Sequence, residues 1–155
     1  MLYTVNGYKD IYTVVTNERK VGGAVEVDEL RLRSGEAFRN VVIMSIEAAE
    51  KGTYMVGFVT EDGRRYIAHT SDISLMVQPT HKRVKDLRNP VAREELMKRR
   101  LKYLRRLLEV NEGNDSFLIR QEVKQLVSDI GFENVRLAEL DTPQMETLQT
   151  TLRIA

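Results

Sequence analysis

A long amphipathic helix constrains the fold of this chain more than any other feature of its sequence. Residues 90–110 place apolar side chains on one arc and cationic side chains on the other at the helical spacing of about 100° per residue. Asn89 is a good N-cap, because its side-chain oxygen can accept a hydrogen bond from an N–H of the first turn. Pro90 suits the first helical position, and Glu94 and Glu95 lie near the positive end of the helix dipole. The pattern predicts a helix with an apolar face for a core or partner and an opposite cationic face.

The charge of the chain is distributed unevenly. The net charge is only +1, yet residues 1–80 carry 9 Lys/Arg against 11 Asp/Glu, residues 81–106 carry 11 against 3, and residues 107–155 carry 4 against 9. The middle segment therefore has an excess of 8 positive charges. Such a segment attracts anionic partners, whatever the overall charge of the protein.

Composition excludes several classes of protein. Of the 155 residues, 42% are hydrophobic and 30% are charged, which is typical of a globular chain and not of a disordered one. No apolar run reaches the ~20 residues of a membrane span, and the first residues lack the features of a secretion signal. The absence of cysteine excludes disulfides, cysteine-ligated zinc and a thiol nucleophile. We therefore expect a cytoplasmic protein.

The first half of the sequence reads as β-structure. Short segments rich in Val, Ile, Tyr and Phe recur about every 8–12 residues between turns that contain Gly, Asn or Asp, which favours a small barrel or sandwich. Asn6-Gly7 between two such segments is a strong hairpin signal, and residues 61–63 form a second hairpin turn. One local alternative is a helical turn over residues 45–51, which have helical composition and precede Gly52.

The second half reads as helical. Helices are expected at about 90–110, 116–130 and 143–153. Gly131 suits a left-handed C-cap after the second of these, and residues 135–140 suit either a strand or a helical turn. The predicted fold is therefore α+β and has three parts: a small antiparallel β-barrel (1–79), a basic linker (80–89) and a helical region (90–155).

Three stretches within residues 30–78 follow one another in a familiar order: L-R-L-R-S-G-E-A-F-R-N-V-V-I (30–43), M-V-G-F-V (55–59) and Y-I-A-H-T-S-D-I-S-L-M-V (66–77). This order resembles the strands of the Sm-like family, and residues 69–77 are similar to the second Sm motif of its bacterial members. Asn40 stands where that family has a glycine in its long strand, and Ala68 where it has a lysine. The resemblance implies a five- or six-stranded SH3-like barrel that binds nucleic acid, and the same pattern suits other SH3-like modules.

The cationic face and the segment before it supply the candidate residues for binding nucleic acid. If they share one surface, they would contact ~4–8 phosphates and give an affinity that falls steeply with salt. No Asn or Gln cluster on the arc suggests readout of base edges, so binding would be directed to the backbone. The alternative to nucleic-acid binding is that this cationic face is solvated and binds no partner. The candidates are Lys82, Arg83, Lys85, Arg88, Lys98, Arg99, Lys102, Arg105 and Arg106.

Five further residues have two interpretations each. Arg93 and Arg100 fall inside the apolar arc of the predicted helix. They either snorkel or pair with acids of the C-terminal segment, or they mark a face left open for a partner or nucleic acid. Tyr54, Phe58 and Tyr66 are either core side chains or a stacking platform for bases on the barrel.

No motif indicates an enzyme. The chain lacks the G-x-S-x-G, H-E-x-x-H, P-loop and G-x-G-x-x-G patterns, and neither histidine is expected in a triad or metal site. We expect no cofactor and no metal. A hydrolase or transferase without a recognised motif remains a third, minor hypothesis behind two others.

The leading hypothesis is a non-enzymatic accessory or regulatory protein that contacts DNA or RNA phosphates through the basic helix, with DNA versus RNA left open. The alternative is a protein–protein adaptor or modulator that docks on a larger enzyme or polymerase. Under this alternative, the acidic segment 107–155 folds against the basic helix in the free protein. Deletion of residues 132–155 is then expected to strengthen polyanion binding.

Overall fold

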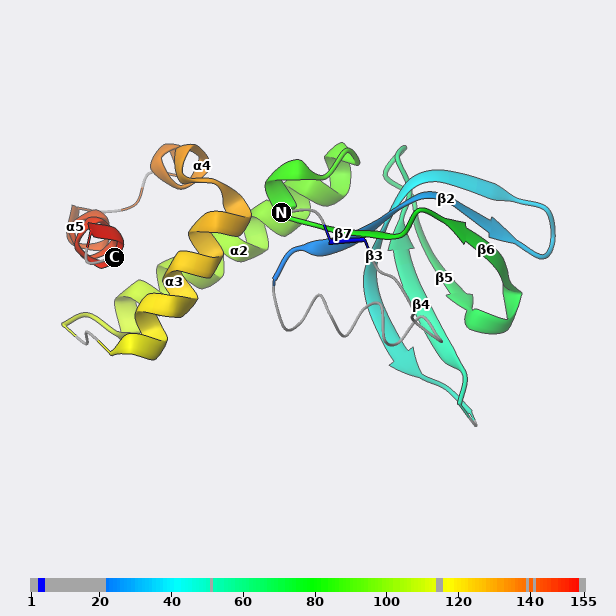
Figure 1. Cartoon of the computed structure of the whole chain (residues 1–155), viewed down its shortest axis with the longest axis horizontal. Coiled ribbons are helices and arrows are strands. Elements are labelled where there is room, and N and C mark those ends of the chain that lie inside the picture. Colours follow the sequence, from blue (N-terminus) through cyan, green and yellow to red (C-terminus); the bar gives the residue numbers. More distant parts are fainter. Residues whose placement is uncertain are drawn as a thin grey trace. The chain divides into compact units, whose positions relative to one another are not determined.

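The chain divides into two compact units, Met1–Glu94 (unit 1) and Glu95–Ala155 (unit 2). Helix α2 (Pro90–Val110) begins in unit 1 and continues in unit 2 (Figure 1). Each unit has its own hydrophobic core. The division therefore falls within this helix and not at residue 79, where the predicted barrel ends. The structure, a computed structural model, describes residues 3–4, 22–50, 52–113, 116–138, 140 and 142–153.

Unit 1 is built on one antiparallel sheet. Its strands are β1 (Tyr3–Thr4), β2 (Ala24–Leu32), β3 (Ala37–Ala48), β4 (Tyr54–Val59), β5 (Arg65–His69), β6 (Ile73–Val77) and β7 (Thr80–Lys82). Neighbouring strands follow the order β1-β7-β2-β3-β4-β5, and β6 also pairs with β2 (Figure 1). β7 pairs with the first residues of β2 and β6 with the last ones. The two short strands therefore share the edge of β2 that lies opposite β3.

The sheet is not closed into the predicted barrel. β5 and β6 are joined by the 3-10 turn η1 (Thr70–Asp72), and no ladder links these two strands within the described part of the chain. His69 caps this turn, because its Nδ1 accepts a hydrogen bond from the Ser71 N–H at 3.2 Å. After the turn, β6 pairs with β2, where Met76 lies opposite Leu30. The antiparallel α+β fold is thus confirmed, whereas closure of the sheet is not.

Residues 45–50 do not form the helical turn that was one alternative for residues 45–51. Strand β3 continues to Ala48, with Ser45 opposite Gly57 and Ile46 opposite Val56. Ile46 is buried and belongs to the core of unit 1. Burial of this apolar side chain in a long ladder outweighs the helical composition of the segment.

The second predicted hairpin turn is confirmed between β4 and β5. The Thr60 N–H donates to the Arg64 carbonyl at 2.9 Å, and Gly63 has a φ of +85°, which glycine adopts without strain. The first predicted hairpin, at Asn6 and Gly7, lies outside the described residues.

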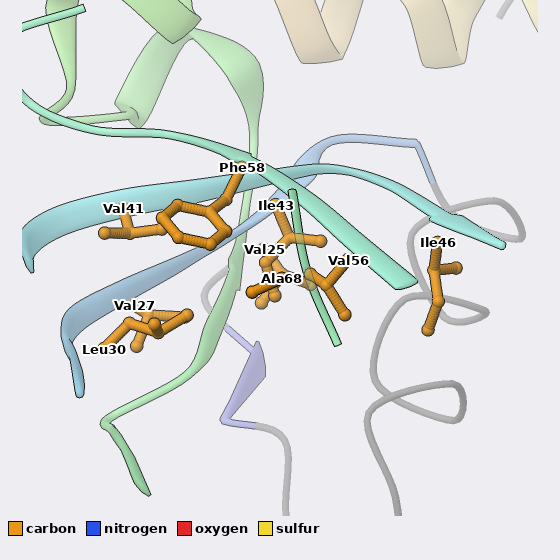
Figure 2. Close-up of a cluster of buried hydrophobic side chains, with 9 residues drawn as sticks. All are labelled: Val25, Val27, Leu30, Val41, Ile43, Ile46, Val56, Phe58 and Ala68. Carbon is orange, nitrogen blue, oxygen red and sulfur yellow. The ribbon is translucent and has the colours of Figure 1, made fainter. Parts of the chain in front are cut away.

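The core of unit 1 gathers apolar side chains from four strands (Figure 2). Phe58 is the largest of these side chains and is only 1% exposed. Its ring lies 5.5 Å from that of Tyr66 and 5.7 Å from that of Phe38, measured between centroids. The buried residues of this core are Val25, Val27, Leu30, Val41, Ile43, Ile46, Val56, Phe58 and Ala68.

Asn40 occupies an unusual backbone position within β3. Its φ is +46°, in the left-handed region that asparagine tolerates better than most L-residues. The Asn40 side-chain amide donates to Glu61 Oε1 at 3.2 Å, and the Asn40 backbone carbonyl accepts from Asn89 Nδ2 at 2.8 Å.

Unit 2 is helical throughout its described elements. Beyond α2 it contains α3 (Phe117–Ile130), α4 (Phe132–Leu137) and α5 (Thr142–Arg153). The three predicted helices are confirmed to within one residue at each end. Of residues 135–140, the first three belong to α4, which buries Val135, so this part takes the helical alternative and not the strand.

Local capping sets the bounds of α3. Ser116 Oγ accepts from the Ile119 N–H at 3.4 Å, and Gly131 has a φ of +92°. Buried side chains of α2, α3, α4 and α5 then form the core of unit 2, among them Leu104, Val127 and Leu148. None of the helices that the structure describes is long and apolar enough to cross a membrane.

Candidate nucleic-acid interface

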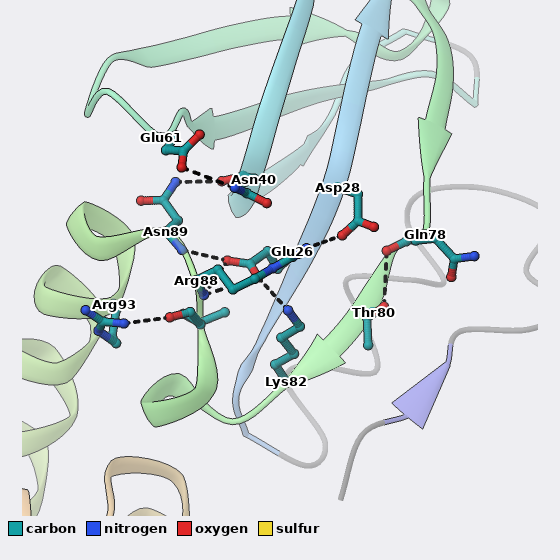
Figure 3. A network of polar contacts seen from close by, with 11 residues as sticks. Glu26, Asp28, Asn40, Glu61, Gln78, Thr80, Lys82, Arg88, Asn89 and Arg93 are labelled. Atoms are coloured by element: carbon teal, nitrogen blue, oxygen red, sulfur yellow. Dashed lines mark hydrogen bonds and ion pairs between the residues drawn. The ribbon is translucent and has the colours of Figure 1, made fainter.

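The segment that leads into helix α2 is organised around one buried carboxylate. Glu26 lies in β2, and its side chain is 0% exposed (Figure 3). Lys82 Nζ lies 2.6 Å from Glu26 Oε1. The backbone N–H groups of Arg88 and Asn89 each donate to Oε2 at 2.9 Å, and Arg88 Nε lies 3.3 Å from Oε1. The Glu26 carboxylate thus accepts hydrogen bonds from four N–H groups of residues 82–89.

These contacts determine the charge state of Glu26. Burial raises the pKa of this carboxyl, because it disfavours the charged form. Hydrogen bonds from Lys82, Asn89 and Arg88 act in the opposite direction and together outweigh burial, so the pKa of Glu26 lies below its ordinary value. The carboxylate is therefore ionised at neutral pH and paired with two cations.

Asn89 connects the sheet to the start of α2. Its Oδ1 accepts from the Ala92 N–H at 3.1 Å, which confirms the predicted N-cap. Its Nδ2 donates to the carbonyls of Asn40 at 2.8 Å and Val59 at 3.1 Å. The fully buried side chain therefore has partners for its oxygen and for both amide hydrogens.

Residues 80–89 are not the predicted basic linker. They form β7 and the 3-10 turn η2 (Val84–Asp86), and Val84 and Leu87 are buried. Lys82 is 13% exposed and Arg88 also pairs with Asp28, so both candidate cations have structural roles beside Glu26. The segment is ordered because a buried carboxylate requires the donors that it supplies. The remaining candidates here are Arg83, which is half-buried, and Lys85, which is exposed.

The five candidate cations on α2 all have exposed side chains. They span nine residues, or about 12 Å along the helix. Arg99 pairs with Glu95 at 2.6 Å, and the Arg105 guanidinium donates to the Ala138 carbonyl. The five are Lys98, Arg99, Lys102, Arg105 and Arg106, and we call them the basic arc of α2.

Arg93 and Arg100 do not mark an open face of the helix. Arg93 Nη1 donates to the Leu87 carbonyl at 2.9 Å. Arg100 Nε lies 3.3 Å from Asp129 Oδ2, and the aspartate is buried. Pairing with an acid of the C-terminal segment was the first of the two interpretations, and it is confirmed for Arg100.

Of the three aromatic candidates, Phe58 is a core side chain, and Tyr54 and Tyr66 pack against that core. Phe58 is buried, and Tyr66 stacks on it and lies 4.7 Å from the ring of Phe38. Tyr54 is half-buried and packs against the same core. This packing supports the first of the two interpretations, as core side chains, most directly for Phe58.

The sequence reading missed Glu26, which organises the whole segment before α2. An available signal was an acid within the apolar strand A-V-E-V, combined with a dense cationic segment elsewhere in the chain. Comparisons of the chain with protein-family models, curated proteins and solved structures found no match.

Proposed function

We propose that this protein is a non-enzymatic nucleic-acid-binding accessory or regulatory protein that contacts DNA or RNA phosphates through the basic arc of α2. The observation that supports this proposal is the exposure of all five cations of the arc on one helix, over a length of about 12 Å. Cations held in this way can follow the spacing of successive phosphates.

The structure narrows the set of residues that this function would use. Lys82 and Arg88 donate hydrogen bonds to the Glu26 carboxylate, and Arg105 donates to the Ala138 carbonyl. We take the exposed residues Lys98, Lys102 and Arg106 as the principal proposed contacts, and the exposed residues Arg99 and Lys85 as further candidates. About four phosphates, in place of the ~4–8 expected from the sequence, give a log–log salt slope of roughly −3 to −4 on duplex DNA.

Unit 1 supports a second part of the proposal, an SH3-like module of the Sm-like type. Four consecutive antiparallel strands, β2 to β5, are followed by a 3-10 turn and by β6, which returns to β2. Asn40 adopts a left-handed conformation at the position where the pattern has glycine. Such a module would provide a docking site for a protein.

Fluorescence anisotropy at several salt concentrations tests the proposal. Labelled single- and double-stranded DNA and RNA are titrated with the wild type and with a variant that carries Lys98→Glu, Lys102→Glu and Arg106→Glu. The matched control reverses three exposed cations outside α2, namely Arg33, Arg39 and Arg64. Both variants change the net charge equally, and every substituted residue is exposed.

We expect micromolar binding by the wild type and by the control, and a loss of at least tenfold in the α2 variant at low salt. Unchanged affinity and salt slope in a folded α2 variant would contradict the proposal. An equal loss of affinity in both variants would show that only the net charge of the protein matters. That result would also contradict a specific role for the basic arc.

A further inference from the structure

Tyr103 is an exposed aromatic residue at one border of the basic arc of α2. It is 45% exposed, although most of a tyrosine side chain is apolar. Arg99 comes one turn before it and Arg106 one turn after it, and at about 100° per residue both lie within about 60° of it around the helix. The ring therefore lies beside two exposed cations of the arc.

A hydrogen bond to α3 fixes the orientation of this ring. The Tyr103 hydroxyl donates to the carboxylate of Glu122, and both residues belong to unit 2. The same hydrogen bond raises the pKa of Tyr103, and burial and the charge of Glu122 act in the same direction. The hydroxyl is therefore protonated at neutral pH. A ring held at its far end loses little conformational freedom when a ligand stacks on it.

Further exposed apolar side chains lie on the same side of the basic arc. Val110 is exposed and lies two turns after Tyr103, about 20° away around the helix. On α3, Leu118 is exposed and lies one turn before Glu122, the partner of Tyr103. Cations that contact phosphates, with an aromatic ring beside them, are the combination by which proteins bind single-stranded nucleic acid.

We propose that the nucleic acid contacted by the basic arc is single-stranded, and that one of its bases stacks on the ring of Tyr103. This inference rests on the proposed function and specifies its class of substrate. With the phosphates of a strand along the arc, a base on the side of α3 reaches the ring. In a duplex the faces of each base are covered by neighbouring base pairs, so Tyr103 has no face on which to stack.

Stacking and phosphate contact depend differently on salt. Phosphate contacts release counterions, so their contribution to affinity falls as salt rises, whereas stacking releases none. Loss of the ring should therefore lower affinity by a similar factor at every salt concentration. Loss of the cations of the arc should instead lower affinity most at low salt.

The variant Tyr103→Leu removes the ring and keeps a large apolar side chain with high helix propensity. Fluorescence anisotropy measures its binding to a labelled strand without self-complementary sequence, alone and annealed to its complement, as DNA and as RNA. The wild type should bind the single strand more tightly than the duplex. Tyr103→Leu should lose about fivefold or more on the single strand and less than about twofold on the duplex.

Two further variants separate stacking from other effects of the substitution. Phe132→Leu is the matched control, because Phe132 is also 45% exposed and lies in α4, outside the helix that carries the arc. It should bind like the wild type. Tyr103→Phe loses only the hydroxyl, so it should stay within about threefold of the wild type on the single strand. Circular dichroism checks that each variant keeps its helical content.

Tryptophan fluorescence gives a direct readout of stacking. The chain has no tryptophan, so Tyr103→Trp introduces a single fluorophore at the proposed stacking position. Its emission should fall when the single strand saturates the protein, because a stacked base quenches the indole. Phe132→Trp is the control, and its emission should change little.

Unchanged single-strand affinity in Tyr103→Leu would overturn the inference. So would an equal loss on the duplex, a loss in Tyr103→Phe as large as that in Tyr103→Leu, or unchanged emission from a Tyr103→Trp variant that still binds. In these cases the variant with Lys98, Lys102 and Arg106 reversed would still lose affinity, and the proposed function would stand. If the wild type binds neither form of nucleic acid, the proposed function fails and the inference fails with it.

Discussion

At the scale of single residues, Glu26 shows that an excess of cations in a sequence need not create a binding surface. Two of the nine cations that the sequence assigns to nucleic acid pair with this buried carboxylate. A buried ion without its partner is costly, so the fold requires these pairs whatever else the segment does. The density of cations along the sequence therefore does not show which of them pair with a buried acid. Only the burial of that acid in the folded protein shows this.

Replacement of Glu26 by glutamine should destabilise the protein by about 2–4 kcal/mol, because Lys82 and two backbone N–H groups lose their charged acceptor. The control is Glu29→Gln in the same strand, whose partly exposed pair with Arg31 is expected to contribute less than about 1 kcal/mol. Urea unfolding followed by circular dichroism gives both values. Similar losses in the two variants would show that burial of Glu26 has no special effect.

The same carboxylate predicts how stability depends on pH. The folded pKa of Glu26 lies below its unfolded value of 4.5, so its stabilisation is complete above that value. The stabilisation is lost as the pH falls through 4.5 toward the folded pKa. The difference in free energy of unfolding between wild type and Glu26→Gln should therefore be constant near neutral pH and shrink below pH 4.5. A difference that grows on acidification would contradict the lowered pKa.

At the scale of elements, the N-terminus of α2 is where a local helix signal and a tertiary contact coincide. Asn89 caps the helix, as its position before Pro90 predicts, and it also donates to carbonyls of β3 and β4. The cap alone would allow serine or aspartate equally well. The amide donors explain why asparagine is the residue that satisfies both demands.

Asn89→Ala should cost about 2–4 kcal/mol, because it removes the cap and leaves two buried carbonyls without a donor. Asn89→Ser keeps a capping oxygen and should recover about 1 kcal/mol of that loss. Thermal and urea unfolding of the two variants measure the difference. Equal stability of the Ala and Ser variants would show that the capping bond contributes nothing.

At the scale of the whole molecule, acidic and basic residues nearly cancel, with a net charge of +1. Deletion of residues 132–155, which the sequence suggested as a test of masking, removes Val135 and Leu148 from the core of unit 2. The deletion would therefore report on folding as well as on electrostatics. Exposed acids of the same segment provide a cleaner test.

Glu133→Gln combined with Glu146→Gln removes two exposed negative charges and raises the net charge from +1 to +3. If the acidic segment competes for the basic arc, affinity for a DNA duplex should rise about two- to fivefold at low salt, and the gain should disappear near 1 M salt, where the Debye length is about 3 Å. Anisotropy titrations at both salt concentrations measure this. A gain that persists at high salt would contradict electrostatic masking.

The sequence by itself determined the helices α2, α3 and α5 and the β-rich character of unit 1, because capping, helical periodicity and turn residues act between near neighbours. The tertiary structure alone decided that the sheet stays open between β5 and β6, that residues 45–48 extend β3, and that Phe58 lies in the core. It also decided that Lys82 and Arg88 pair with Glu26. Glu26 and Lys82 are 56 residues apart in the sequence, so no local pattern could indicate their pairing. Contacts over such separations depend on burial and strand register, which exist only once the chain has folded.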